Sequence, residues 1–305
     1  MSYFYGPVPS RRLGLSLGVD IVKKKTCSFD CIYCQLGRTT NKTIERQSFI
    51  DFKKFRLQLK KIIKKNPSID YITISGSGEP TLNKDLGKII KAIKRITKNK
   101  YPVCVITNSS LLHLKEVRDD LQLSDLIIPS LDAADAKTFY KIDRPLACVK
   151  FKKITEGLIS LRKEFKGKIW LEIVLVGGIN DTIEQARKFK KLIEIIKPDK
   201  VQLNIPIRPS ATKIKLPPKE KIYQFKKNIG QDVEIIFNYK GKKQKKLEKA
   251  IEFQILNYLK RRPATLKDLK VCFNLGLTTL KKYLKKILNK KIYKKNQYFI
   301  FKGNR

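Results

Sequence analysis

Cys27-Ser28-Phe29-Asp30-Cys31-Ile32-Tyr33-Cys34 is the segment from which the chemistry of this chain is inferred first. It places three cysteines at a C-x3-C-x2-C spacing directly after a predicted first strand. A four-iron, four-sulfur cluster has one more iron corner than this stretch has thiolates, so one iron would lack a protein ligand. A substrate or cofactor would bind at that open corner.

Two other interpretations of the cysteines stay open. Positions 27, 31 and 34 also have i, i+4, i+7 spacing, which suits the buried face of a helix. A structural zinc site normally closes with four Cys or His ligands. The single His113 lies far along the chain, and the other cysteines, Cys104, Cys148 and Cys272, stand alone.

The first residues contain no charged segment followed by an apolar one, and no stretch has the length of a membrane span. We therefore expect no membrane partner and a cytoplasmic protein, in which clustered thiols indicate metal binding or catalysis rather than disulfides.

The charge of the chain is unusual for a globular protein. With 305 residues, 42% of them hydrophobic, two domains are expected, but the net charge of +41 exceeds what solubility requires and attracts polyanions. A lysine-rich genome would explain the many lysines, but not the shortage of acidic residues. Residues 240–305 hold 21 Lys and Arg against three acidic residues, which predicts that RNA or DNA binds there.

Short apolar strands alternate with helical patterns along the first 210 residues. After a loop and short strand over residues 9–22, strands are expected at 71–74, 102–107, 125–131, 169–176 and 200–205, and helices at 51–65, 86–96, 114–122, 150–164 and 182–196. This order predicts βαβ units and a parallel sheet. A full eight-unit barrel takes about 250 residues, so the α/β fold expected is a partial (β/α)6 TIM-type barrel. An open doubly wound sheet is the alternative, although no Gly-rich fingerprint follows the first strand.

The C-terminal part has a pattern of its own. A helix near 219–228 and a strand at 233–237 complete a predicted first domain, 1–238, and a basic linker, 239–246, leads to a second domain, 247–305. Apolar stripes and a Thr265/Asp268 cap signal predict three helices before a hairpin, which together indicate a winged helix-turn-helix. The third helix, with Lys281, Lys282, Lys285 and Lys286, would read nucleic acid, unless the domain is a protein-docking module.

The cysteine stretch, with Tyr33 before its last Cys, resembles the signature of the radical S-adenosylmethionine (SAM) superfamily. Gly76-Ser77-Gly78-Glu79-Pro80, after the second strand, resembles a variant of its GGEP motif. The resemblance covers about residues 6 to 210. It implies a partial barrel, a 4Fe-4S cluster on Cys27, Cys31 and Cys34, and SAM on the open iron, with the GSGEP turn holding the SAM amino group. A Gly-rich strand-to-helix turn is the structural alternative for that motif.

Further polar residues follow later strands, where the chemistry of a parallel barrel lies. By resemblance, SAM would contact these residues as well: Asn108, Ser130, Asp132, Asn204 and Ile205. Glu172 lies on the fifth strand, where alternate residues face the barrel interior, so it is a candidate for reaching SAM or substrate. Arg11 and Arg12 are either solvated or bind an anionic group.

The superfamily resemblance also implies a mechanism. A one-electron donor of the flavodoxin or ferredoxin type reduces the cluster, and the electron cleaves SAM to methionine and a 5'-deoxyadenosyl radical that abstracts a substrate hydrogen. The cofactor supplies the chemistry, and the protein aims it. No acid–base pair is needed, in agreement with a chain that holds one His.

Two runs, Ser130-Leu131-Asp132-Ala133 and Lys141-Ile142-Asp143-Arg144-Pro145, are similar to those of wybutosine-synthesising tRNA radical SAM enzymes. They make Arg144 a candidate contact to substrate or to the SAM carboxylate. Those enzymes carry extra N-terminal cysteines that this chain lacks. The opening Gly6-Pro7-Val8-Pro9-Ser10-Arg11-Arg12-Leu13-Gly14 and the winged helix resemble an uncharacterised radical SAM group, distantly similar to nitrogenase-cofactor maturases.

Three functions follow as expectations. The first is a radical enzyme that acts on RNA, which the resemblance implies to be tRNA, with the basic tail delivering the substrate. The second is a radical enzyme on a small molecule or peptide, with the winged helix for docking or regulation. The third is a redox-sensing cluster that governs a nucleic-acid-binding tail.

Overall fold

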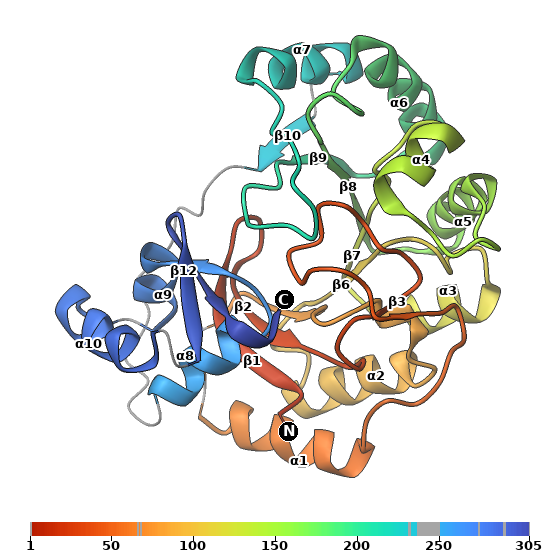
Figure 1. Ribbon diagram of the computed structural model, residues 1–305. Helices are drawn as coiled ribbons and strands as arrows, with labels where there is room; N and C mark the ends of the chain where they lie inside the picture. Colours follow the sequence, from red (N-terminus) through yellow and green to blue (C-terminus); the bar gives the residue numbers. More distant parts are fainter. Residues whose placement is uncertain are drawn as a thin grey trace.

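The computed structural model describes residues 2–65, 67, 69–230, 233–236, 251–273, 275–288 and 291–304. The strands of its main sheet are β1 (Phe4–Ser10), β2 (Gly14–Val19), β5 (Tyr71–Ile74), β6 (Val103–Thr107), β7 (Leu126–Pro129), β8 (Lys168–Val174), β9 (Lys200–Asn204) and β10 (Val233–Ile236). Their spatial order follows the sequence, with β1 and β10 at the two edges (Figure 1).

All neighbouring strands from β2 to β10 are parallel, as predicted. The six strands expected for the barrel are present, and the further strand expected at 233–237 is β10, a seventh parallel strand. Because the order is linear, the sheet is an incomplete barrel rather than a closed one. The fold class predicted from the alternating pattern is therefore confirmed.

The prediction was incomplete at the start of the chain. The short strand expected within residues 9–22 is β2, but the prediction missed β1, which pairs with β2 as an antiparallel hairpin in which Pro9 lies opposite Leu15. β1 is an edge strand. Proline is tolerated in an edge strand, because there its missing N–H is not needed for a hydrogen bond to a second neighbouring strand.

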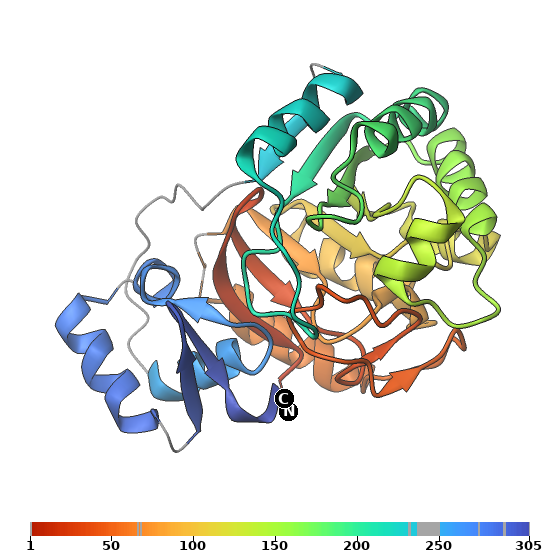
Figure 2. The same ribbon diagram turned by 45° about the horizontal axis from the view of Figure 1, so that its top comes forward.

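Helices cover the outer face of the sheet (Figure 2). They are α1 (Phe52–Ile63), α2 (Leu86–Thr97), α3 (Lys115–Leu121), α4 (Ala136–Asp143), α5 (Phe151–Glu164), α6 (Ile183–Ile196) and α7 (Lys219–Ile229). The amphipathic stripes explain their placement: in α2, for example, Leu86, Ile89, Ile90 and Ile93 are fully buried against the sheet. α4 is an element that the sequence pattern did not predict.

The C-terminal module, residues 251–304, forms its own core. It contains α8 (Ile251–Leu259), β11 (Ala264–Thr265), α9 (Leu266–Phe273), α10 (Leu277–Ile287), β12 (Ile292–Lys295) and β13 (Tyr298–Phe301). The three helices and the hairpin lie where they were predicted, and β11 joins the hairpin in a three-stranded sheet. Its designation as a winged helix-turn-helix domain stays a prediction, and the expected linker, 239–246, lies outside the described residues.

The module packs directly on the hairpin at the edge of the barrel. Val8 of β1 belongs to the same buried cluster as Ile255, Leu269 and Leu280 of the module. The thiol of Cys272 donates to the carbonyl oxygen of Pro7 at 2.8 Å. In both views of the ribbon the module lies beside β1 and β2 (Figures 1 and 2). None of the described helices has the length and apolar character needed to cross a membrane.

Candidate active site

The three cysteines lie in a loop that the surrounding chain holds on two sides. Cys27 ends the short strand β3 (Thr26–Cys27), which pairs with β4 (Asn41–Lys42). The end of α4 holds one side of the loop, where the Ile32 amide donates to the Ile142 carbonyl at 2.9 Å. On the other side, the Ala211 amide donates to the Cys34 carbonyl at 2.9 Å. The loop is thus fixed by segments that follow it by more than a hundred residues.

The three thiols form no disulfide and are partly buried. Their environment disfavours the charged thiolate form unless a positive charge lies nearby. Burial is the main cause that raises the pKa of Cys27 to about 12, and it also raises the pKa of Cys31 and Cys34. A thiolate here needs a cationic partner such as iron. Within the described residues, no group of three His, Cys, Asp or Glu is arranged around a point that could hold a single metal ion. A cluster, which takes one thiolate on each of several irons, needs no such convergence.

The GSGEP turn lies against the cysteine strand. Gly76 has a φ of +148°, and an ideal Cβ at Gly78 would lie 1.9 Å from the carbonyl oxygen of Thr26. That oxygen accepts the Glu79 amide at 3.1 Å, and the Lys25 amide donates to the Ser77 carbonyl at 2.6 Å. Glycines in this turn therefore permit the close approach of the two backbones.

Asp20, immediately after β2, holds the same turn from the other side. Its carboxylate accepts the Ser77 amide at 3.2 Å and also the Ser77 hydroxyl. The parallel register places Val19 opposite Ile74, so Asp20 and the turn leave the sheet at the same level. Sequence reasoning did not select Asp20, because an acidic residue after a strand is more often a turn former.

Glu79 acts as a buried structural acceptor. One carboxylate oxygen accepts the Thr81 amide at 3.0 Å and the Thr107 hydroxyl at 2.6 Å, and the other accepts the Asn108 amide at 2.7 Å. Its neighbour Pro80 begins the short 3-10 helix Pro80–Leu82 and is buried. The Glu79 side chain thus joins the turn after β5 to the end of β6.

Asn108 and Ser130 follow the next two strands, as predicted. The Asn108 amide group donates to Ser28 Oγ at 2.9 Å and to Cys27 Sγ at 3.4 Å, so it ties β6 to the cysteine loop. The Ser109 hydroxyl donates to the backbone carbonyl oxygen of Ser130 at 2.7 Å. Both residues line the cavity described below.

Tyr33 and Asp132 form a buried contact beneath the cysteine loop. The Tyr33 hydroxyl donates to one Asp132 oxygen, and the other accepts the Val174 amide at 2.7 Å. Burial is the main cause that raises the pKa of Asp132 to about 7. Asp132 is 3% exposed and supports Tyr33, which itself lines the cavity.

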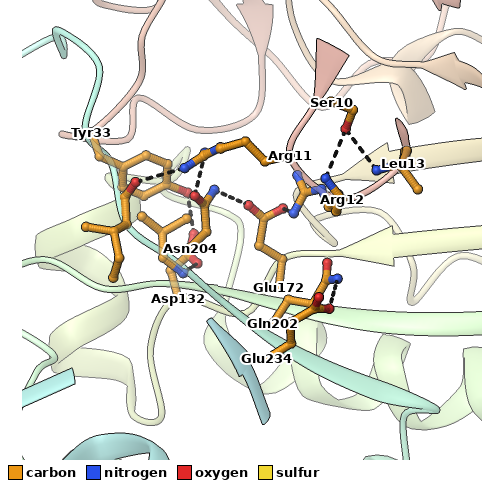
Figure 3. A network of polar contacts seen from close by, with 12 residues as sticks. Ser10, Arg11, Arg12, Leu13, Tyr33, Asp132, Glu172, Gln202, Asn204 and Glu234 are labelled. Carbon is orange, nitrogen blue, oxygen red and sulfur yellow. Dashed lines mark hydrogen bonds and ion pairs between the residues drawn. The ribbon is translucent and has the colours of Figure 1, made fainter. Parts of the chain in front are cut away.

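A second network crosses the barrel interior (Figure 3). The carboxylate of Glu172 lies between Arg12, with an ion-pair distance of 2.5 Å, and the amide of Asn204. Arg11 donates to Asn204 Oδ1 at 2.7 Å and to the Ile205 carbonyl at 3.3 Å. Glu172, for which the interior was expected, and Asn204 both line the cavity, and Arg12 and Arg11 pair with these two side chains.

One cavity of about 360 Å³ unites these groups. Its walls include most of the predicted site residues, namely Cys27, Cys31, Tyr33, Cys34, Gly76, Ser77, Gly78, Glu79, Asn108, Ser130, Glu172 and Asn204. Pro80, Asp132 and Ile205 lie behind this wall and support it. The sequence analysis missed three arginines that also line it, Arg208, Arg261 and Arg262, because no local pattern shows that the tail returns to the barrel.

Arg144 is not among the residues that line the cavity. It ends α4 with a φ of +45°, and its carbonyl accepts the Asp30 amide at 3.2 Å. Its place in this structure is therefore to shape the turn that supports the cysteine loop, and its contact with substrate or SAM stays a prediction.

Comparison with known proteins gives a consistent result. The family model described as the radical SAM superfamily matches residues 21–190. A UPF0026 protein from Methanocaldococcus jannaschii is 40% identical over 73% of this chain and 69% of its own length. A protein from Brachyspira hyodysenteriae named GTPase Obg is 42% identical over 93% of this chain, which spans only 42% of that relative.

A solved structure of TYW1 with a lysine-pyruvate adduct bound has a similar fold. The match has a TM-score of 0.54 and 21% identity, and covers 74% of this chain and 75% of the other. At this identity the likeness concerns the fold alone.

Proposed function

This chain belongs to the radical SAM superfamily, and on that premise we propose that Cys27, Cys31 and Cys34 hold its 4Fe-4S cluster and that the neighbouring strand ends hold SAM. The observation that carries the proposal is the single cavity shared by the three thiols, the GSGEP turn and Asn108. The three cysteines fit a 4Fe-4S cluster, because thiolates bind its irons and three thiolates leave one iron open.

When bound, the reduced cluster would supply one electron for the cleavage of SAM to methionine and a 5'-deoxyadenosyl radical, the species that would take a hydrogen atom from the substrate. The chain itself binds and orients. Asp20 and Thr26 fix the turn that would face the SAM amino group, and Asn108 joins that turn to the cysteine loop. The buried network of Glu172, Arg12 and Asn204 keeps another part of the cavity wall in one arrangement.

The test is cluster binding and SAM cleavage by the full chain. After anaerobic reconstitution we expect about four irons per chain, and 5'-deoxyadenosine after reduction with dithionite. Single Ala substitutions of Cys27, Cys31 or Cys34 should abolish both. Cys148→Ala is the matched control, because Cys148 is exposed and does not line the cavity. Full cluster retention in two of the three site variants would contradict the proposal.

For the substrate we propose RNA, approached from the C-terminal module. Arg11 and Arg208 line the cysteine cavity and also a second cavity of about 370 Å³, whose walls include Lys267 and Lys294 of the module. Further exposed lysines lie on α10 of the module, among them Lys281. Basic residues of the module thus line a cavity that shares Arg11 and Arg208 with the cysteine cavity, and phosphate contacts from such residues are the sequence-independent part of nucleic-acid binding.

The RNA proposal needs a variant other than truncation. Removing the module would also remove Arg261 and Arg262 from the cavity wall and uncover Val8. We would instead replace four exposed lysines of the module by Gln, Lys267, Lys281, Lys285 and Lys294. The control replaces four exposed lysines of α1 and α6, Lys60, Lys61, Lys190 and Lys191.

Crosslinking in cells followed by sequencing of the attached nucleic acid is the measurement. We expect the unmodified chain and the control to capture one defined RNA, and the module variant to lose it. No defined RNA on any chain would contradict the RNA proposal and favour a small molecule or peptide. Absence of 5'-deoxyadenosine from a protein with an intact cluster would favour the redox sensor.

A further inference from the structure

Arginines crowd the part of the cavity wall away from the cysteines. Those that line it are Arg11, Arg12, Arg208, Arg261 and Arg262, from the turn between β1 and β2, the loop after β9, and the segment that follows α8. Among the described residues of this wall, the acidic ones are Glu79 and Glu172. Glu79 is saturated by hydrogen bonds and Glu172 is paired with Arg12. The cavity therefore carries an excess of positive charge.

Two of these arginines have structural partners that account for them. Arg12 pairs with Glu172 at 2.5 Å. Arg261 donates to the carbonyls of Asn257 at 2.9 Å and Ser2 at 3.0 Å and lies over the ring of Tyr5. The contacts of Arg261 with Ser2 and Tyr5 fasten the module to the barrel. Arg12 Nη1 and Arg261 Nε have no hydrogen-bond partner among the described residues, but each arginine is in an ion pair closer than that of Arg208, at 2.5 Å to Glu172 and 3.5 Å to Asp20. Neither side chain is therefore the best candidate for an incoming group.

Arg208 is different, because its partners do not balance its burial. Its side chain is 14% exposed, its ion pair with Asp268 is long at 3.8 Å, and its buried Nε has no hydrogen-bond partner among the described residues. A buried donor without an acceptor costs free energy that an incoming oxygen would recover. Arg208 also lines both cavities, at the point where they meet.

Arg11 and Arg262 add charge at the same place, although both are hydrogen-bonded. Arg11 donates to Asn204 and the Ile205 carbonyl, and Arg262 donates to the Tyr258 hydroxyl at 2.7 and 3.0 Å. Burial, followed by the positive charges of Arg208 and Arg12, lowers the pKa of Arg11 to about 10. Burial and the charge of Arg262 lower the pKa of Arg208. The guanidiniums thus lie close enough to repel one another, and an anion among them would relieve that repulsion. Arginine is the residue best suited to bind a phosphate group in this way.

We propose that Arg208, with Arg11 and Arg262, forms a subsite for a phosphate group of the substrate, at the junction of the barrel and the C-terminal module. The inference rests on the proposed function, and it names the group by which the substrate is held. The phosphate belongs either to the backbone of a nucleic acid or to a small phosphorylated molecule. In both cases one wall of the subsite is the module itself, through Arg262.

The probe is inorganic pyrophosphate, titrated calorimetrically into the cluster-loaded full chain under anaerobic conditions. We expect Arg208→Gln and Arg262→Gln to weaken its binding about 10-fold or more each, since each removes a charge-assisted contact. Arg208→Lys keeps the charge and should lose less. Arg187→Gln, on the exposed face of α6, removes the same charge elsewhere and should bind as the unmodified chain does.

SAM titration of the same variants separates this subsite from the SAM site. We expect unchanged SAM affinity in Arg208→Gln, whereas an equal loss of SAM and pyrophosphate binding would assign Arg208 to the SAM carboxylate and overturn the proposal. Pyrophosphate binding that none of the variants weakens would overturn it as well. Because this binding needs no SAM cleavage, its failure is distinguishable from a failure to form 5'-deoxyadenosine.

Competition with the bound pyrophosphate identifies the source of the phosphate. A short uridine oligonucleotide that competes where UMP does not indicates a phosphodiester backbone. UMP that competes as well as the oligonucleotide indicates a small phosphorylated molecule. Failure of both to compete would overturn the assignment of the subsite to a substrate phosphate.

Discussion

Gly78 stands where the turn after β5 meets the cysteine strand. An added Cβ would lie 1.9 Å from the Thr26 carbonyl oxygen, which is itself fixed by the Glu79 amide. We predict that Gly78→Ala separates the two segments, lowers the free energy of unfolding by about 1–3 kcal/mol, and reduces the iron bound after reconstitution. Urea unfolding and iron analysis measure the two effects.

Gly276→Ala is the matched control, because a Cβ there meets nothing within 4 Å and its φ of −60° suits any residue. Equal iron content in the two variants would show that the contact at Gly78 is not needed for the cluster. The sequence predicted this motif from its glycines. It gave no sign of Thr26 as the partner, since that contact depends on how two loops meet in space.

At the level of elements, α4 connects the cysteine loop to the rest of the barrel. Asp135 caps this helix by accepting the Thr138 amide at 2.9 Å, and it also accepts from Gln185 at 2.6 Å and Lys188 at 3.0 Å, both on α6. Burial raises the pKa of Asp135, but these hydrogen bonds outweigh it and hold the pKa well below its usual range. The charged carboxylate is therefore the form that stabilises the fold.

We predict that Asp135→Ala lowers the free energy of unfolding by about 1–2 kcal/mol at pH 7. A depressed pKa in the folded state means that this contribution is present above the unfolded value of about 3.9 and is lost as the pH falls below it. Urea unfolding at several pH values should show the difference between Asp135→Ala and the unmodified chain shrinking below about pH 4.

The control for that prediction is Asp51→Ala, which removes the cap of α1 and its bond from the Lys54 amide at 3.0 Å. We expect it to cost stability at pH 7 without reducing bound iron, whereas Asp135→Ala should reduce both, because α4 ends against the cysteine loop. Unchanged iron content in Asp135→Ala would contradict a supporting role for α4.

Periodicity predicted the six strands and most helices of the barrel because each of these elements buries one regular apolar face. It failed for β1, whose Pro7 and Pro9 indicate a loop but are tolerated at a sheet edge. It failed also for α4, where eight residues are too few for a clear stripe. The strand-end residues of the site follow from the fold class, whereas Arg208 and Arg262 depend on long-range packing that no local pattern encodes.

For the whole molecule, the main consequence of the structure is that the tail is part of the cavity wall. A basic linker and a separate core suggest a module that moves freely, but Val8 is buried in the core of the module and Cys272 and Arg261 bond to the first residues of the chain. The binding that we propose at the module and the chemistry that we propose at the cysteines would therefore share one wall. This arrangement suits a substrate held by its phosphate while the barrel acts on another part of it.

We predict that barrel and module unfold together. Trp170 is the single tryptophan and lies on β8, so its fluorescence reports the barrel, whereas far-UV circular dichroism reports both parts. The two urea curves should coincide in the full chain, as a cooperative transition requires.

Val8→Asp buries a carboxylate between the parts and should separate the curves, with the dichroism change beginning at lower urea. Leu161→Ala, within the barrel on α5, should shift both curves equally. Curves that already differ in the unmodified chain would show that the module folds independently, and that its arginines reach the cavity only part of the time.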